Sequence, residues 1–210
     1  MLIRTAAIGV TTLLASATLA LPTTAPASAA PGTTSLAQVL AADGNRFDTN
    51  HRDFDIVDRA VRTVLKAKPH SPVGLLAKGK KRATAFVPTD RAFMRLVKSL
   101  TGTAPTSEKR TFRTVASVAD VDTLETILLY HVVPGATITS TKAAKADGAA
   151  LMTAQGGKLR VNVWKSGRIF LRDLDRNARN AEVQADLVDI NRGNKQIAHG
   201  INRVLRPVNL

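Results

Sequence analysis

The segment TAFVPTDRAF, Thr84–Phe93, decides the fold class of this 210-residue chain. The stretch Ala83–Val87 is small and apolar, which predicts a short buried strand. Pro88 ends that strand, because proline has no amide hydrogen to donate to a neighbouring strand. The side-chain oxygens of Thr89 and Asp90 can then accept from the free amides of a helix start. A strand that runs directly into a helix is therefore expected here.

Helices are predicted on both sides of this segment. Ser35 and Gln38 have the spacing of a capping box, which favours a short helix after Ser35. The apolar residues of that helix are Leu36, Val39 and Leu40. Apolar residues also recur at helical spacing over Ile56–Leu65, and prolines follow that stretch. Three further helices are expected, one with Phe93, Leu96, Val97 and Leu100 on one face, and two at Ser107–Ala116 and Asp120–Leu129.

Beyond Pro134 the period of the apolar residues falls from the helical value to two. Strands are predicted there, the first two joined by a turn at Ser166-Gly167: Leu159–Val163, Ile169–Leu171, Val183–Leu187 and Ile197–Leu205. Helices followed by hairpins in one short chain indicate an α+β fold rather than an alternating parallel α/β sheet.

Three segments, taken together and in order, resemble the fasciclin family. Thr84–Phe93 is similar to the first motif of the family. The segment LETILLYHVVPG at Leu124–Gly135 is similar to the middle segment, which contains a Tyr-His pair. The segment IAHGINRVLRP at Ile197–Pro207 is similar to the closing strand. The resemblance covers residues 54–207. It implies a fasciclin-like, wedge-shaped β-sandwich of about seven strands with flanking helices in the N-terminal half. It also implies adhesion or matrix binding by secreted or surface-attached proteins that share no enzymatic activity.

Most of the motif residues are interpreted as scaffolding, because strand ends, helix caps and tight turns account for them. These residues are Thr84, Phe86, Pro88, Thr89, Asp90, Phe93, Pro134, Gly135, His199, Asn202, Leu205 and Pro207. Tyr130 and His131 lie between an apolar helix and a Pro-Gly turn, where ring packing and backbone hydrogen bonds are the simplest role. In some animal relatives a Tyr-His stretch is proposed to contact cell-surface receptors, so a structural and a binding role both stay open for this pair.

The N-terminal end has the pattern of a secretory signal peptide. Arg4 supplies a positive charge, an apolar stretch follows to Leu21, and Ala27-Ser28-Ala29 is an A-x-A cleavage site. We predict a signal peptide over residues 1–29, a lead-in with one short helix over 30–53 and a fasciclin-like domain over 54–210. No stretch after residue 29 is apolar enough to cross a membrane. The mature protein is expected outside the cell, secreted or loosely associated with the cell wall.

The formal net charge of +14 favours anionic partners. The basic residues are densest in KGKKR, and we therefore single out Lys78, Lys80, Lys81 and Arg82 as candidate binding residues. The predicted partner is an extracellular or envelope polymer, or a cell-surface protein. The alternative is a solvated basic surface that confers solubility and non-specific attraction.

The sequence lacks the common catalytic and metal-binding patterns. It has no Gly-x-Ser-x-Gly elbow, no cysteine, no His-Glu-x-x-His and no metal-ligand spacing among its four histidines. Asp173-x-Asp175-x-Asn177 begins like a calcium loop, but Ala178 stands where glycine must turn. Loop aspartates cap and form turns more often than they gather round a cation; this interpretation applies to Asp43, Asp48, Asp53 and Asp55. We predict no enzyme, no cofactor and no metal.

Two functions follow from different classes of protein. Because Trp164 and Tyr130 are the single tryptophan and tyrosine, aromatic stacking on bases is poorly supported, and no specific nucleic acid is expected. The preferred function is a secreted extracellular binding module of the fasciclin type, attached to anionic cell-envelope or matrix material. The alternative is a small-molecule-binding or uncharacterised enzymatic domain that uses a cleft near Tyr130 and His131.

Overall fold

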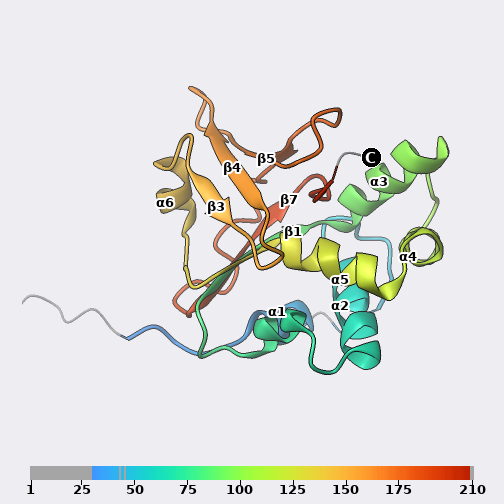
Figure 1. Cartoon of the computed structure of the whole chain (residues 1–210), viewed down its shortest axis with the longest axis horizontal. Coiled ribbons are helices and arrows are strands. Elements are labelled where there is room, and N and C mark those ends of the chain that lie inside the picture. The colour runs from blue at the N-terminus through green and yellow to red at the C-terminus, as the bar shows by residue number, and fades with distance from the viewer. Residues whose placement is uncertain (1–29, 43, 45, 209–210) are drawn as a thin grey trace, which may run out of the picture. The chain divides into compact units, whose positions relative to one another are not determined.

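A computed structural model describes residues 30–42, 44 and 46–208 of the chain (Figure 1). The predicted signal peptide over 1–29 and the acidic residue Asp43 lie outside the described residues. Among the described residues, all helices but one short one lie before residue 131, and all strands but one lie after it. The predicted α+β organisation is therefore confirmed.

The predicted helices are all present among the described residues, and two of them carry side-chain caps that the sequence analysis did not predict. The Ser107 and Asp120 side chains accept from the amides of Arg110 and Thr123, three residues further on. A 3₁₀ helix and one short helix are additional to the prediction. The elements are α1 (Leu36–Leu40), α2 (Asp55–Ala67), the 3₁₀ helix η1 (Pro72–Ala77), α3 (Asp90–Thr101), α4 (Glu108–Val118), α5 (Val121–Tyr130) and α6 (Ser140–Ala144).

The strands form two sheets. In the first sheet β1 lies between an antiparallel β2 and a parallel β7, and Ala83 is opposite Gln196 at the start of the parallel pair. The second sheet is antiparallel with the order β3-β4-β5-β6. The bounds are β1 (Ala83–Pro88), β2 (Val132–Pro134), β3 (Ala150–Met152), β4 (Lys158–Val163), β5 (Ile169–Arg172), β6 (Ala181–Glu182) and β7 (Gln196–Ile201).

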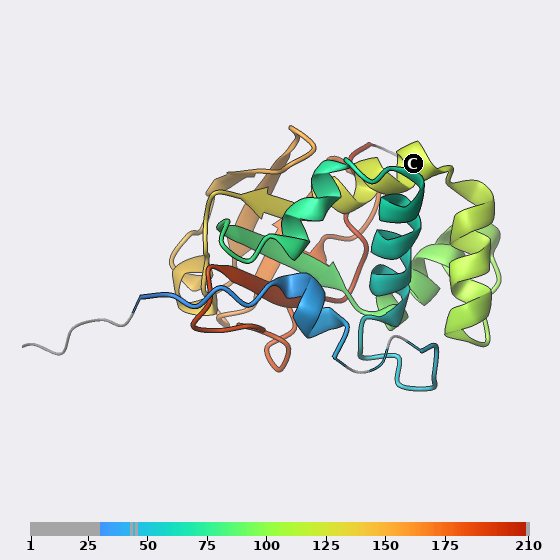
Figure 2. The ribbon, with the colours of Figure 1, turned by 90° about the horizontal axis from the view of Figure 1, so that it is seen from below.

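Strand β1 separates two apolar cores. Its residues Ala83, Ala85 and Val87 pack into a cluster formed mainly by the helices, whereas Phe86 belongs to the cluster between the two sheets. Figures 1 and 2 show the same arrangement, with α2–α5 on one side of β1 and the second sheet on the other. Because both faces are covered, every residue of β1 is buried, and this explains why the strand is mostly apolar and lacks the alternation of a half-exposed strand.

Four details of the sequence prediction are wrong. The expected cap of α3 is not formed, because the Thr89 side chain bonds no α3 amide and Asp90 Oδ1 accepts from the Ile56 amide instead. A strand was expected at Val183–Leu187, but the strand there is β6 at Ala181–Glu182, because the pairing with β5 ends at Glu182. Beyond it the chain turns, and the Leu187 amide donates to the Gln184 carbonyl. Alternation of apolar residues does not by itself fix which residues pair. The closing strand ends at Ile201 rather than Leu205. Leu100 is 47% exposed, because it lies in the last turn of α3, beyond the packed face.

The lead-in belongs to the helical core. The Ser35–Gln38 capping box is present, and Leu36 and Leu40 are buried in the same cluster as α2 and η1. The segment also bridges to the C-terminal half, since the Gly32 amide donates to the Gly193 carbonyl over 2.8 Å. Among the described residues, no helix combines the length and the apolar character that a membrane crossing requires.

Candidate functional site

The basic turn, defined as Lys78, Lys80, Lys81 and Arg82, lies between η1 and β1 with all four side chains exposed. The Lys81 amide closes the turn by donating to the Lys78 carbonyl over 2.8 Å. The buried Gln196 side chain holds the turn from below, because its Nε2 donates to the carbonyls of Leu75 and Lys78 over 2.8 and 3.1 Å. The four cationic side chains therefore extend from a fixed backbone.

Gly79 lets the lead-in lie directly on this turn. A Cβ atom at position 79 would stand 1.8 Å from the Thr33 carbonyl oxygen, so any side chain would push the two segments apart. The glycine inside the KGKKR cluster thus has a packing role. It fixes the position of the basic turn relative to the lead-in.

Lys195 extends the basic surface from another part of the chain. Because β1 and β7 are parallel, Arg82 and Lys195 precede neighbouring strand starts. The Thr137 hydroxyl connects them, since it accepts from Arg82 Nη1 over 3.2 Å and donates to the Lys195 carbonyl over 2.6 Å. Within the part of the chain that the structure describes, no carboxylate lies within 4.0 Å of the basic-turn nitrogens. The sequence analysis missed Lys195, although its place just before the closing strand was a usable signal.

A second group of cations, the arginine hollow, was not predicted. Arg95, Arg179, Arg203 and Arg206 line a small cavity of about 20 Å³. Arg206 forms an ion pair with the buried carboxylate of Asp175 over 2.8 Å. Burial, followed by repulsion from the other three guanidinium groups, lowers the pKa of Arg203. These arginines come from α3, the loop after β5 and the C-terminal segment, and nothing in their sequence spacing indicates that they meet.

Tyr130 is fully buried between the sheets. Its ring contacts Gly157 so closely that a Cβ atom there would stand 2.8 Å from Tyr130 Cε2. Its hydroxyl donates to the Lys158 carbonyl over 3.0 Å. Burial raises the pKa of Tyr130 to about 12. The side chain thus joins the end of α5 to the start of β4.

His131 is 5% exposed and connects α5 to the C-terminal segment. The Leu205 amide donates to His131 Nε2 over 2.9 Å, so Nε2 carries no proton. Nδ1 must then carry the proton, which it donates to the Ile127 carbonyl over 2.7 Å. Burial lowers the pKa of His131 to about 4, which keeps the ring neutral at physiological pH.

Other motif residues also make internal contacts. The Thr84 hydroxyl donates to the Ala136 carbonyl and accepts from the Ile138 amide, both over 2.9 Å. The buried His199 ring stacks on Phe86 at 5.9 Å between centroids. Asn202 Oδ1 accepts from the Glu182 amide over 2.9 Å and thereby connects β7 to β6.

Two cavities lie near the Tyr-His pair. An apolar cavity of about 30 Å³ is lined by His131 and by side chains of β1, α2 and α5. That volume is roughly a tenth of the smallest ordinary ligand pocket. A larger groove of about 390 Å³ runs between α5 and the C-terminal segment, where Ile127 and Leu205 provide part of the lining.

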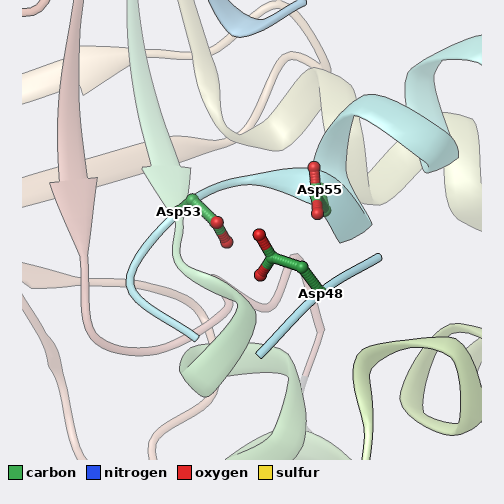
Figure 3. Close-up of side chains that lie close together, drawn as sticks. All are labelled: Asp48, Asp53 and Asp55. Atoms are coloured by element: carbon green, nitrogen blue, oxygen red, sulfur yellow. The ribbon is translucent and has the colours of Figure 1, made fainter. Parts of the chain in front are cut away.

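Carboxylates gather where three helices begin. Ligand-capable oxygens of Asp48, Asp53 and Asp55 lie within 4.8 Å of one another, as do those of Asp53, Asp90 and Glu108. Figure 3 shows the carboxylates of Asp48 and Asp53 facing each other beside the first turn of α2, where Asp55 lies. We call these five residues the acidic junction.

The calcium-loop fragment has a different set of contacts. Arg206 binds Asp175 through its guanidinium group and Asp173 through its backbone amide, the latter over 2.9 Å. Asp175 Oδ1 also accepts from the amides of Asn177 and Ala178. Both aspartates therefore hold the C-terminal segment and the loop after β5 in place.

Comparisons with known proteins agree with this fold. The family model described as the fasciclin domain matches residues 61–207. Among sixteen matching chains of solved structures is a FAS1 domain pair from the insect cell adhesion molecule fasciclin I. The TM-score is 0.51 at 18% identity, over 75% of this chain and 48% of that one, so this chain spans about half the length of its structural neighbour. No curated protein matched the sequence.

Proposed function

This chain belongs to the fasciclin domain family, and on that premise we propose that it is a secreted adhesion-type module whose basic turn binds anionic polymers of the cell envelope or matrix. The structural neighbour is a cell adhesion molecule, which supports the adhesion class. Secretion rests on the signal-peptide pattern of residues 1–29. The domain proper is proposed to begin at residue 54, with 30–53 as the lead-in.

The exposed, unpaired charge of the basic turn carries the proposal. Four cationic side chains project from one short turn whose backbone is held by Gln196, and Lys195 lies at the adjacent strand start. A polymer with closely spaced anions would release counterions when it docks there. For four contacts, and by analogy with nucleic acids, raising the salt from 50 to 200 mM should weaken binding roughly 50- to 150-fold.

Tyr130 and His131 are assigned a structural role within this proposal. Both rings are buried, and each donates or accepts hydrogen bonds inside the domain. A partner could touch them only after α5 and the C-terminal segment had separated. We therefore expect His131→Ala to lower the stability of the fold. Below its melting temperature, the variant should attach to the polymer about as strongly as the wild type.

The test is retention of the mature protein on immobilised heparin and on purified envelope fractions over a salt series. A variant with glutamine at Lys78, Lys80, Lys81 and Arg82 should bind at least tenfold more weakly in 50 mM salt. It should also show a shallower salt dependence, because fewer counterions are released. Circular dichroism should show an unchanged fold.

Two matched variants separate a docking site from net charge alone. Glutamine at the exposed Lys98, Lys109, Lys145 and Lys165 removes the same charge elsewhere and should leave most of the affinity. Glutamine at Arg95, Arg179 and Arg203 tests the arginine hollow. An equal loss of affinity in the basic-turn variant and in the lysine control variant would mean that net charge alone attaches the protein. A loss confined to the arginine variant would move the docking site to the hollow.

A small-molecule-binding or enzymatic domain is the second candidate function, and the groove between α5 and the C-terminal segment favours it. At about 390 Å³ the groove has the volume of a small ligand site, and Asp120, Thr126 and Arg206 offer polar contacts. A thermal-shift screen of metabolites distinguishes the two functions. A compact ligand whose stabilisation disappears in Thr126→Trp would favour the groove over the basic turn.

A further inference from the structure

The acidic junction assembles at the starts of three helices. Asp55, Asp90 and Glu108 are the first residues of α2, α3 and α4, and Asp48 and Asp53 come from the loop that precedes α2. Backbone bonds hold this loop in place. The Asp48 amide donates to Glu108 Oε2 over 2.7 Å, and the Asp90 amide donates to the Asp53 carbonyl over 3.1 Å. Five carboxylates are thereby brought together in a protein of net charge +14.

A buried oxygen at the junction has no hydrogen-bond partner. The Asp90 side chain is fully buried, and its Oδ1 accepts from the Ile56 amide over 3.0 Å. Its Oδ2 is buried without a partner, and Asp90 is one of the three residues, with Asp53 and Glu108, whose ligand-capable oxygens lie close together. A buried carboxylate in this setting requires either a proton or a cation.

We propose that the acidic junction binds one Ca²⁺ ion, held by carboxylate oxygens of Asp48, Asp53, Asp55, Asp90 and Glu108. The oxygens lie within 4.8 Å of one another inside each of two groups of three, Asp48–Asp53–Asp55 and Asp53–Asp90–Glu108, and Asp53 belongs to both. Such spacing fits an ion beside Asp53 with Ca–O distances of 2.3–2.6 Å, since oxygens on opposite sides of it would be about 5 Å apart. Ca²⁺ accepts irregular shells of six to eight oxygens, whereas Mg²⁺ requires a near-ideal octahedron. The ion would tie the lead-in loop to the starts of α2, α3 and α4.

A shared proton is the competing explanation for the same geometry. A protonated Asp90 could donate a hydrogen bond to the neighbouring Asp53 carboxylate. The two accounts differ in one measurable respect. Ca²⁺ would displace that proton on binding, so calorimetric heats measured in buffers of different ionisation enthalpy would report proton release.

The test uses the mature chain, stripped with EDTA and titrated with CaCl₂ at pH 7.5. We expect saturable binding with a Kd of about 1 mM or tighter, in the range of extracellular calcium modules. A hundredfold excess of Ca²⁺ over Kd should raise the Tm by roughly 5–10 °C. MgCl₂ at the same concentration should raise it less. Absence of calorimetric heat and of any Tm change would overturn the proposal, and an equal response to Mg²⁺ would overturn the assignment to Ca²⁺.

Two variants locate the ion. Asp48→Asn alters an exposed residue and retains the oxygen that accepts from the Asn50 amide over 2.6 Å, so the variant should fold normally in EDTA. Its Ca²⁺ affinity should fall at least tenfold. The control variant is Asp122→Asn. Asp122 is an exposed carboxylate of α5 that pairs with Lys68 at the C-terminal end of α2, far from the junction at the start of that helix, so the Ca²⁺ affinity should stay unchanged. Equal Ca²⁺ affinity in the Asp48→Asn variant and the wild type would place the ion elsewhere.

Discussion

At the scale of single residues, His131 shows how burial converts a titratable group into a fixed connector. Its two ring nitrogens bond the Ile127 carbonyl and the Leu205 amide, so the neutral tautomer with the proton on Nδ1 is required. The pKa of His131 falls from the ordinary 6.5 to about 4 because the ring is buried. In the unfolded chain the ring binds a proton from about pH 6.5 downward, whereas the folded state resists protonation until about pH 4.

The resulting prediction concerns stability in acid. Between pH 6.5 and 4 the unfolded state binds more protons at this site, so the contribution of His131 to stability decreases as the pH falls. The loss should reach about 3 kcal/mol at pH 4. Asp90 works in the opposite direction over this range, because its pKa is raised. The measurement is therefore the difference in urea unfolding free energy between wild type and His131→Gln at several pH values. A difference that does not change with pH would contradict the assignment.

At the scale of elements, Asp90 joins two helices rather than capping its own. Thr89 occupies the N-cap position of α3, but its side chain makes no hydrogen bond to the α3 amides. Asp90 Oδ1 instead accepts from the Ile56 amide, near the start of α2. The strand-to-helix transition was predicted correctly, yet its polar residues stabilise the junction between α2 and α3.

This arrangement predicts unequal effects of substitution, measured by urea unfolding in EDTA. Asp90→Ala removes the acceptor for α2 and should cost about 0.5–2 kcal/mol. Asp90→Asn keeps that acceptor and should cost less, because the carboxyl group is already neutral at pH 7 when its pKa is about 9. Thr89→Val should also cost less than Asp90→Ala. A larger loss for Thr89→Val would show that Thr89 caps α3 after all.

At the scale of the whole molecule, the lead-in links the N-terminal and C-terminal halves. The family match begins at residue 61, but Leu36 is fully buried and its amide donates to Gln196 over 2.9 Å. Gly32 adds two backbone hydrogen bonds, because its amide donates to the Gly193 carbonyl and its carbonyl accepts from the Lys195 amide. Proteolytic processing must therefore spare the residues from Gly32 onward if the core is to stay intact.

Cleavage of the predicted signal peptide meets this requirement. Cutting after Ala29 or Ala30 removes no residue of these contacts, whereas a cut inside α1 would expose Leu40 and neighbouring core residues. N-terminal sequencing of protein from culture medium should therefore read from Ala30 or Pro31. Recovery of chains that retain Met1, or of cytoplasmic protein alone, would refute export by this route.

The sequence by itself determined the features that depend on local rules. Helix periodicity, the cap at Ser35 and the all-buried run of β1 were predictable because they depend on residues a few positions apart. The exposure of the basic turn was also predictable, because consecutive cations just before a buried strand remain in water.

Only the tertiary structure decided which distant residues meet. The parallel pairing of β1 with β7 brings Lys195 to the basic turn, and the convergence of three helix starts joins Asp48 and Asp53 to Glu108, about sixty positions away. Burial likewise enclosed Tyr130 and His131, whose sequence context allowed either role. Charge balance and solvent access depend on positions in space, and a single sequence specifies those positions only through the packing of the whole chain.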